Sequence, residues 1–148
     1  MDGQFVPGAT GMTITFPAAI EAAMCEHARS GAPEEVVGVL AGTHGDVDST
    51  VRRAYRAKNA AAESRTRYEI APSDEFELLE RIDADDLDCV GFYHSHPKGP
   101  PEPSGIDRRL AAWPGYSYVM VSLAQRQAEI ESWRWRGDRF EHETIRIS

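Results

Sequence analysis

The fold of this chain is decided by residues 94–107, which read HSHPKGPPEPSGID. An apolar run ends at His96 and predicts a buried strand. Four of the next seven residues are prolines, which suit neither a helix interior nor a central strand. Ser104 then has the character of a helix cap, with Asp107 in the first turn. We therefore expect a strand, a stiff loop and a short helix running to about residue 113.

The histidines of this segment are spaced so that they can share one metal ion. His94 and His96 occupy positions i and i+2 of the expected strand, so their side chains project from the same face. The loop returns the chain to a helix whose first turn supplies the carboxylate of Asp107. Two neutral imidazoles and one carboxylate, with a fourth position left to water, are typical of a catalytic zinc site. We therefore expect one Zn²⁺ per chain, bound by His94, His96 and Asp107.

Each of these features also has an explanation that needs no metal. A histidine pair in a strand more often serves packing or lies at the surface. Ser104 and Asp107 fit an ordinary helix cap, and the prolines could merely stiffen a surface loop. The combined spacing is what favours a metal site. His27, His44 and His142 lack ligand spacing, and we expect them at the surface.

The rest of the chain predicts a mixed α/β (α+β-like) domain, in which a largely antiparallel sheet is flanked by helices. Helical apolar spacing follows Pro17, and Ser73 is expected to cap a second helix. Apolar or alternating segments predict further strands at residues 12–16, 36–41, 47–57, 68–70, 116–123, 128–136 and 140–147. We assign residues 1–11, which are rich in glycine, to a flexible N-terminal arm and residues 12–148 to a single domain.

Composition excludes several classes of function. The chain has 148 residues and a net charge of −8, and it offers no basic stripe for phosphates, which argues against a nucleic-acid partner. No apolar stretch reaches membrane-spanning length and no signal peptide is evident, so we expect a cytoplasmic protein without a membrane partner. Cys25 and Cys89 form no CxxC pair, and we expect two reduced, largely buried thiols.

Residues 94–107 resemble the signature of the JAMM (MPN+) zinc metalloprotease family. That signature is a remote glutamate, then His-Ser/Thr-His, seven residues, Ser, two residues and Asp. Here seven residues separate His96 from Ser104, and two separate Ser104 from the aspartate. The family's glutamate stands just before a buried strand and three residues ahead of a glycine, which matches Glu35 and Gly38. The whole motif is specific.

The resemblance spans roughly residues 12–123 and implies the MPN/JAMM fold. It also implies that Glu35 is the catalytic acid/base and that the Ser104 hydroxyl stabilises the oxyanion. Glu34 competes for the first role, but the family spacing and the strand parity select Glu35. From its position alone, a glutamate beside an apolar strand is more often a solvated edge residue. Only the resemblance identifies it.

The function that the resemblance implies is cleavage after the C-terminal glycine of a small ubiquitin-like modifier. The short chain, the acidic excess and the two lysines are similar to compact archaeal, desampylase-like members, which remove such modifiers from lysine side chains. Two alternatives stay open. One is the processing of sulfur-carrier ubiquitin-like proteins by the same chemistry, and the other is a non-catalytic MPN scaffold. A DNA-repair-associated relative is disfavoured by the acidic composition.

Overall fold

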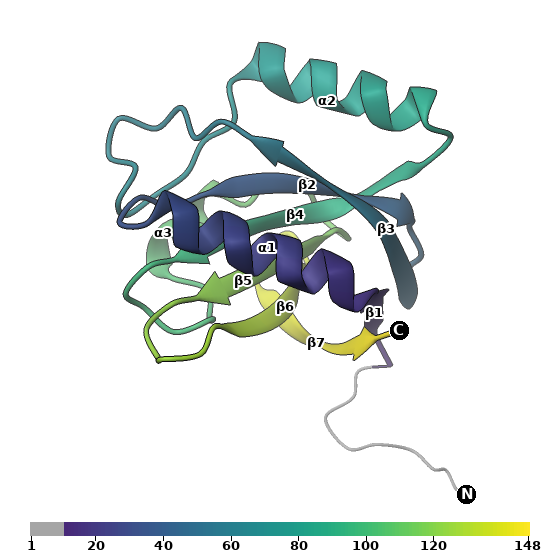
Figure 1. Ribbon diagram of the computed structural model, residues 1–148. Coiled ribbons are helices and arrows are strands. Elements are labelled where there is room, and N and C mark those ends of the chain that lie inside the picture. The colour runs from purple at the N-terminus through teal and green to yellow at the C-terminus, as the bar shows by residue number, and fades with distance from the viewer. Residues whose placement is uncertain (1–10) are drawn as a thin grey trace, which may run out of the picture.

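A closed sheet forms the centre of the structure, which is a computed structural model describing residues 11–148 (Figure 1). Its strands are Thr13–Phe16 (β1), Val37–Thr43 (β2), Asp48–Ala57 (β3), Asp88–His96 (β4), Ser117–Ser122 (β5), Glu129–Trp135 (β6) and Phe140–Ile147 (β7). The helices are Ala18–Gly31 (α1), Pro72–Ala84 (α2) and Gly105–Leu110 (α3).

The strands follow the order β1-β3-β2-β4-β5-β6-β7, and β7 pairs back with β1, so that the sheet closes into a barrel. Neighbouring strands are antiparallel except at β1–β3, β1–β7 and β4–β5, which are parallel. The expected fold class, a mixed sheet flanked by helices, is confirmed. The closure was not expected, because the pattern of β1 does not reveal that this short strand pairs on both of its edges.

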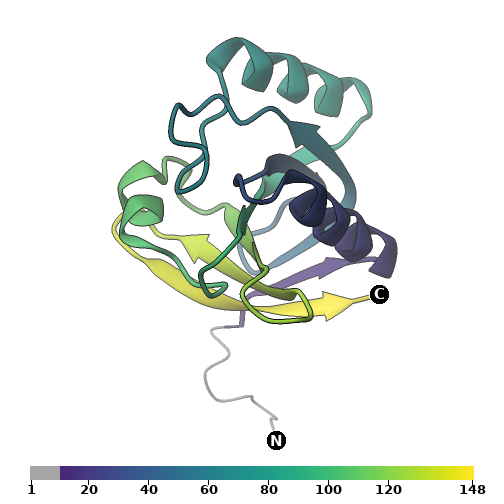
Figure 2. The same cartoon turned by 60° about the vertical axis from the view of Figure 1, so that its left-hand side comes forward.

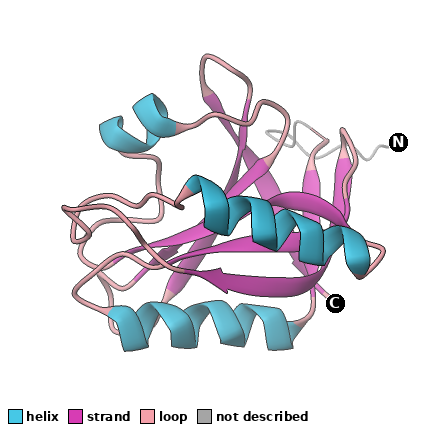
Figure 3. Ribbon diagram, turned by 90° about the horizontal axis from the view of Figure 1, so that it is seen from above, coloured by secondary structure: helices cyan, strands magenta, loops and turns pink. Residues whose placement is uncertain are grey.

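The two long helices cover the outside of the strands, and the short α3 lies apart from both (Figure 3). Helix α1 packs against β3, β4 and β5, and α2 packs against β3 and β4. The buried apolar side chains accordingly form two clusters. The first includes Met24 of α1 and the second includes Leu78 of α2. On β4 the neighbours Tyr93 and Phe92 belong to the first and the second cluster respectively, as alternation along a strand requires.

The same alternation directs the two histidines of β4. His94 and His96 follow Phe92 at intervals of two, so they lie on the side of the second cluster. Figures 1 and 2 show that α3 and the loop between β3 and α2 lie at the same end of the sheet. The carboxyl end of β4 is therefore enclosed by segments that are far apart in the sequence.

Three local expectations are wrong. Tyr68–Ile70 is not a strand, because the backbone N–H of Glu69 donates to the Asn59 side chain and its carbonyl accepts from Ala60 instead of from a neighbouring strand. Helix α2 begins at Pro72 without a side-chain cap, since proline suits the first helical position. Helix α3 ends at residue 110 rather than 113.

Other expectations meet the structure only in part. Cys25 and Cys89 are free thiols, as expected, and are half-buried. His27 is also half-buried, and its Nδ1 lies 2.7 Å from the hydroxyl of Tyr93. The arm expected over residues 1–11 lies, apart from Gly11, outside the described residues. The helices of the described part are too short or too polar to cross a bilayer.

The approach of β4 to β5 yields a prediction about stability. Gly91 pairs with Ser117, and a Cβ at residue 91 would lie well inside contact distance of the Ser117 carbonyl. Because the backbone of one strand must then shift, we expect Gly91→Ala to lower the free energy of unfolding by roughly 1–3 kcal/mol in a urea titration. In the control Gly105→Ala an added Cβ meets nothing within 4 Å. Equal stability of both variants would contradict the close approach.

Candidate metal centre and active site

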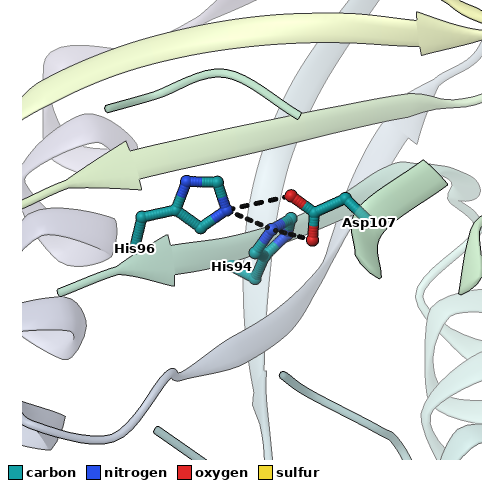
Figure 4. Close-up of side chains that lie close together, drawn as sticks. All are labelled: His94, His96 and Asp107. Atoms are coloured by element: carbon teal, nitrogen blue, oxygen red, sulfur yellow. Dashed lines mark hydrogen bonds and ion pairs between the residues drawn. The ribbon is translucent and has the colours of Figure 1, made fainter. Parts of the chain in front are cut away.

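Three side chains from β4 and α3 meet in one buried corner (Figure 4). The Nε2 atoms of His94 and His96 are 3.1 Å apart. His94 Nε2 lies 3.2 Å from Oδ1 of Asp107, and His96 Nε2 lies 3.0 Å from its Oδ2. Strand parity brings the two imidazoles to one face, and the turn into α3 brings the carboxylate to them.

These distances fit a shared metal ion. Ligand atoms about 2.0–2.1 Å from one tetrahedral zinc lie roughly 3.3 Å from one another, close to the observed 3.0–3.2 Å. Lone pairs that face each other in a buried site repel unless a proton or a cation lies among them. The His-His-Asp group can therefore hold a divalent cation, and within the described residues it is the one cluster found with this property.

A capping box fixes the direction of the Asp107 carboxylate. The backbone N–H of Asp107 donates to Ser104 Oγ over 3.0 Å, and the backbone N–H of Ser104 donates to Asp107 Oδ2 over 2.9 Å. The helix-cap explanation and the metal-ligand explanation are thus both compatible with the geometry, since the cap orients the ligand. Ser104 uses a lone pair of its hydroxyl in the cap, so the hydroxyl hydrogen stays available to another acceptor.

The two imidazoles are oriented in different ways. His96 Nδ1 donates to the carbonyl of Pro100 over 2.7 Å, which leaves Nε2 with its lone pair. The Nδ1 atom of His94 is buried and has no hydrogen-bond partner among the described residues. The ring of Tyr68 stacks on His94 with 4.4 Å between the centroids. On the Nδ1 side, packing rather than a hydrogen bond therefore holds the His94 ring.

The charges of the cluster favour a cation. Burial raises the pKa of Asp107, but its interactions with the His94 and His96 imidazoles and with the Ser104 N–H outweigh burial and hold this pKa well below its usual range. Burial lowers the pKa of His94, which favours the neutral imidazole that binds metals. For His96 burial is the largest single influence and also lowers the pKa, but the interactions with Asp107, with the Pro100 carbonyl and with the charge of Glu35 together outweigh it and raise the pKa.

Glu35 stands at the entry to β2 and, unlike the exposed Glu34, is buried, with 6% of its surface accessible. Its Oε1 has no hydrogen-bond partner among the described residues. Burial raises the pKa of Glu35 to about 7, with His96 lowering it and Asp107 raising it to a smaller extent. A carboxyl group with this pKa can both accept and release a proton at neutral pH.

The backbone around Glu35 is tied to the loop between β3 and α2 and to β4. Its N–H donates to the Ser64 carbonyl over 2.6 Å, and its carbonyl accepts from Asn59 Nδ2 over 2.9 Å. The next N–H, that of Val36, donates to Ser95 Oγ over 2.8 Å. Ser95 lies between the two histidines, so this bond couples the position of Glu35 to the metal cluster.

A cleft of about 540 Å³ opens onto the cluster. Glu35, His96 and Ser104 line it, together with the proline loop (residues 97–103) and with Arg65 of the facing loop. The structure thus brings together all five residues singled out in the sequence, with three of them at the cleft. Trp113 instead lines a separate cavity of about 420 Å³.

Sequence reasoning missed the residues that support the cluster. The sequence around Tyr68 does not indicate a role at the site, because an aromatic residue after a polar loop is also typical of a strand. Asn59 holds the ends of its loop together through bonds to the Arg67 carbonyl and from the Ala61 N–H. An asparagine at the start of a polar loop is the kind of residue that makes such local bonds, and this was the available signal.

The fold and the cluster define a class of small mixed α/β domains with a His-His-Asp metal-binding group beside a buried glutamate. Residues 17–136 match the family described as prokaryotic homologs of the JAB domain, and the chain belongs to this family. The resemblance to JAMM proteins is thereby confirmed.

Two relatives of the chain carry names that describe an activity. It is 41% identical to a desampylase of Haloferax volcanii over 143 residues, covering 93% of this chain and 99% of the relative. It is 35% identical to a CysO-cysteine peptidase of Mycobacterium tuberculosis, over 76% of this chain and 75% of the relative. The solution structure of protein DSY2949 from Desulfitobacterium hafniense superimposes with a TM-score of 0.84 at 29% identity, covering 91% and 92% of the two chains.

Burial of Glu35 predicts a pH-dependent effect on stability. The pKa of Glu35 is about 7 in the folded protein and about 4.3 in an unfolded chain. As the pH rises, Glu35 therefore loses its proton at a lower pH in the unfolded state than in the folded state. The free energy of unfolding therefore falls as the pH rises through this interval. We expect chelator-treated Glu35→Gln to be more stable than chelator-treated wild type by roughly 2 kcal/mol at about pH 8, and equally stable near pH 4.

Urea unfolding at the two pH values measures this difference. Glu34→Gln is the matched control, because residue 34 is exposed, and it should leave the stability unchanged at both. A Glu35→Gln protein that is no more stable than wild type at the higher pH would show that burial of the ionised carboxylate does not destabilise the folded protein.

Proposed function

We propose that this protein is a zinc-dependent isopeptidase that cleaves after the C-terminal glycine of a small ubiquitin-like modifier. Zn²⁺ is bound by His94, His96 and Asp107, and Glu35 and Ser104 are the catalytic residues. The observation that carries the proposal is the geometry beside an open cleft: the Nε2 atoms of His94 and His96 lie 3.1 Å apart, and each lies 3.0–3.2 Å from one carboxylate oxygen of Asp107.

A zinc ion held by two imidazoles and a carboxylate supplies Lewis acidity toward water and toward the scissile carbonyl. Glu35 acts as the base that accepts a proton from the attacking water and then as the acid that delivers it to the departing lysine nitrogen. Its location at the cleft and its pKa of about 7 support both roles. The first transfer protonates the carboxylate, and the second regenerates it for the next turnover.

Ser104 stabilises the negative charge that develops on the scissile carbonyl oxygen. Its hydroxyl accepts the cap bond from Asp107, so its hydrogen can be donated to the oxyanion. The residue is exposed in the cleft. Because the cap also fixes Asp107, one residue combines a structural and a catalytic role.

The relatives support the choice of substrate. The desampylase matches this chain over nearly its whole length, which favours lysine-linked conjugates of small ubiquitin-like modifiers as substrates. The peptidase relative, with 35% identity, favours as a second candidate the processing of a sulfur-carrier ubiquitin-like protein by the same residues. A non-catalytic scaffold is disfavoured, because it would have no need to retain all five site residues.

The proposal is tested with a small ubiquitin-like modifier joined through its C-terminal glycine to a lysine side chain. We expect cleavage that a chelator abolishes and added Zn²⁺ restores. Glu35→Ala should be inactive but retain one zinc, whereas His94→Ala should lose both activity and zinc. Ser104→Ala should reduce turnover by about 10²–10³-fold.

Glu34→Gln serves as the control and should cleave at the wild-type rate. A parallel assay on a modifier carrying one extra C-terminal residue separates the second candidate function from the first. Normal cleavage by Glu35→Ala, or cleavage that is insensitive to chelator, would refute the mechanism.

A further inference from the structure

The proline loop is held by its carbonyl groups. Prolines have no backbone N–H, and four of the seven residues 97–103 are prolines, so the loop has few donors of its own. Three consecutive carbonyls, those of residues 99, 100 and 101, each accept one side-chain hydrogen bond. The donors are Ser122 Oγ at 2.5 Å, His96 Nδ1 at 2.7 Å and Trp133 Nε1 at 3.0 Å.

The middle bond of this series determines how His96 faces the metal cluster. A proton held on Nδ1 by the Pro100 carbonyl leaves Nε2 as the atom that points to Asp107. The direction of the imidazole therefore depends on where that carbonyl lies. The bonds on either side of it come from β5 and β6, which are paired strands of the closed sheet.

We propose that Trp133 and Ser122 are positioning residues of the metal centre, which act on the zinc ligand His96 through the carbonyls that flank Pro100. The two residues are remote from the metal-binding motif in the sequence, and their side chains donate to carbonyl groups of the loop. Ser122 is fully buried, and its oxygen also accepts from the Ala124 N–H over 3.2 Å, so its hydroxyl hydrogen is directed to the loop.

Trp133 is likewise held in place by its surroundings. Its ring contacts the imidazole of His142 edge to face, with 4.9 Å between the centroids. The neighbouring strand end is fixed as well, because the Leu123 N–H donates to the carbonyl of His96 over 3.1 Å. The backbone of His96 is thus anchored to the β5 end directly, and its imidazole is anchored through the loop.

The inference rests on the proposed metal site, and its test measures zinc affinity rather than activity. Trp133→Phe keeps an aromatic ring but removes the N–H donor. We expect it to raise the dissociation constant for Zn²⁺, measured by competition with a chromogenic chelator, by about tenfold. Trp135→Phe is the matched control, since Trp135 lies on the same strand and its indole N–H donates to no other described residue. It should bind zinc as wild type does.

Ser122→Ala provides an independent variant and should weaken zinc binding in the same direction. Urea unfolding of the chelator-treated proteins shows that each variant is folded, and Co²⁺ spectra of the loaded proteins report the altered ligand field. If Trp133→Phe and Ser122→Ala both bind zinc as tightly as Trp135→Phe, the positioning role is refuted while the metal site stands. If wild type binds no zinc, both proposals fail.

Discussion

The rest of this structure depends on one constraint in a buried corner: the Nε2 atoms of His94 and His96 lie 3.1 Å apart, and each lies 3.0–3.2 Å from one carboxylate oxygen of Asp107. Burial removes the water that would separate their lone pairs, so the arrangement is favourable only with a positive charge among them. The end of β4, the cap of α3 and the proline loop each hold one of the three groups. The surrounding fold therefore suits a cation at this point, with the candidate ligands His94 and Asp107 fully or almost fully covered.

The groups assigned to chemistry and the groups assigned to binding occupy different levels of the same site. Glu35 and Ser104 line the cleft together with the candidate ligand His96, whereas His94 is covered by Tyr68 and Asp107 is held by the cap. Burying a carboxyl group at the cleft raises its pKa to about 7. The same desolvation that destabilises the ionised Glu35 gives it the pKa that the proposed proton transfer requires, and active sites commonly combine such a stability cost with function.

Much of the site could be predicted from the sequence, because it depends on short-range rules. The i, i+2 spacing of His94 and His96 sets a common face, and the Ser104 cap sets the direction of Asp107. Glu35 could be identified only by resemblance, since burial at the start of a strand leaves no local pattern. The barrel closure and the contacts of Trp133 could not be predicted either, because both join segments that are far apart in the chain and are decided by tertiary packing.

The most direct measurement is anomalous X-ray diffraction at the zinc edge from crystals of the zinc-loaded protein. A single strong peak about 2 Å from Nε2 of His94, Nε2 of His96 and a carboxylate oxygen of Asp107 is expected. An ordered structure with no peak there, or with zinc bound only at other residues, would contradict the metal centre and with it the proposed isopeptidase chemistry.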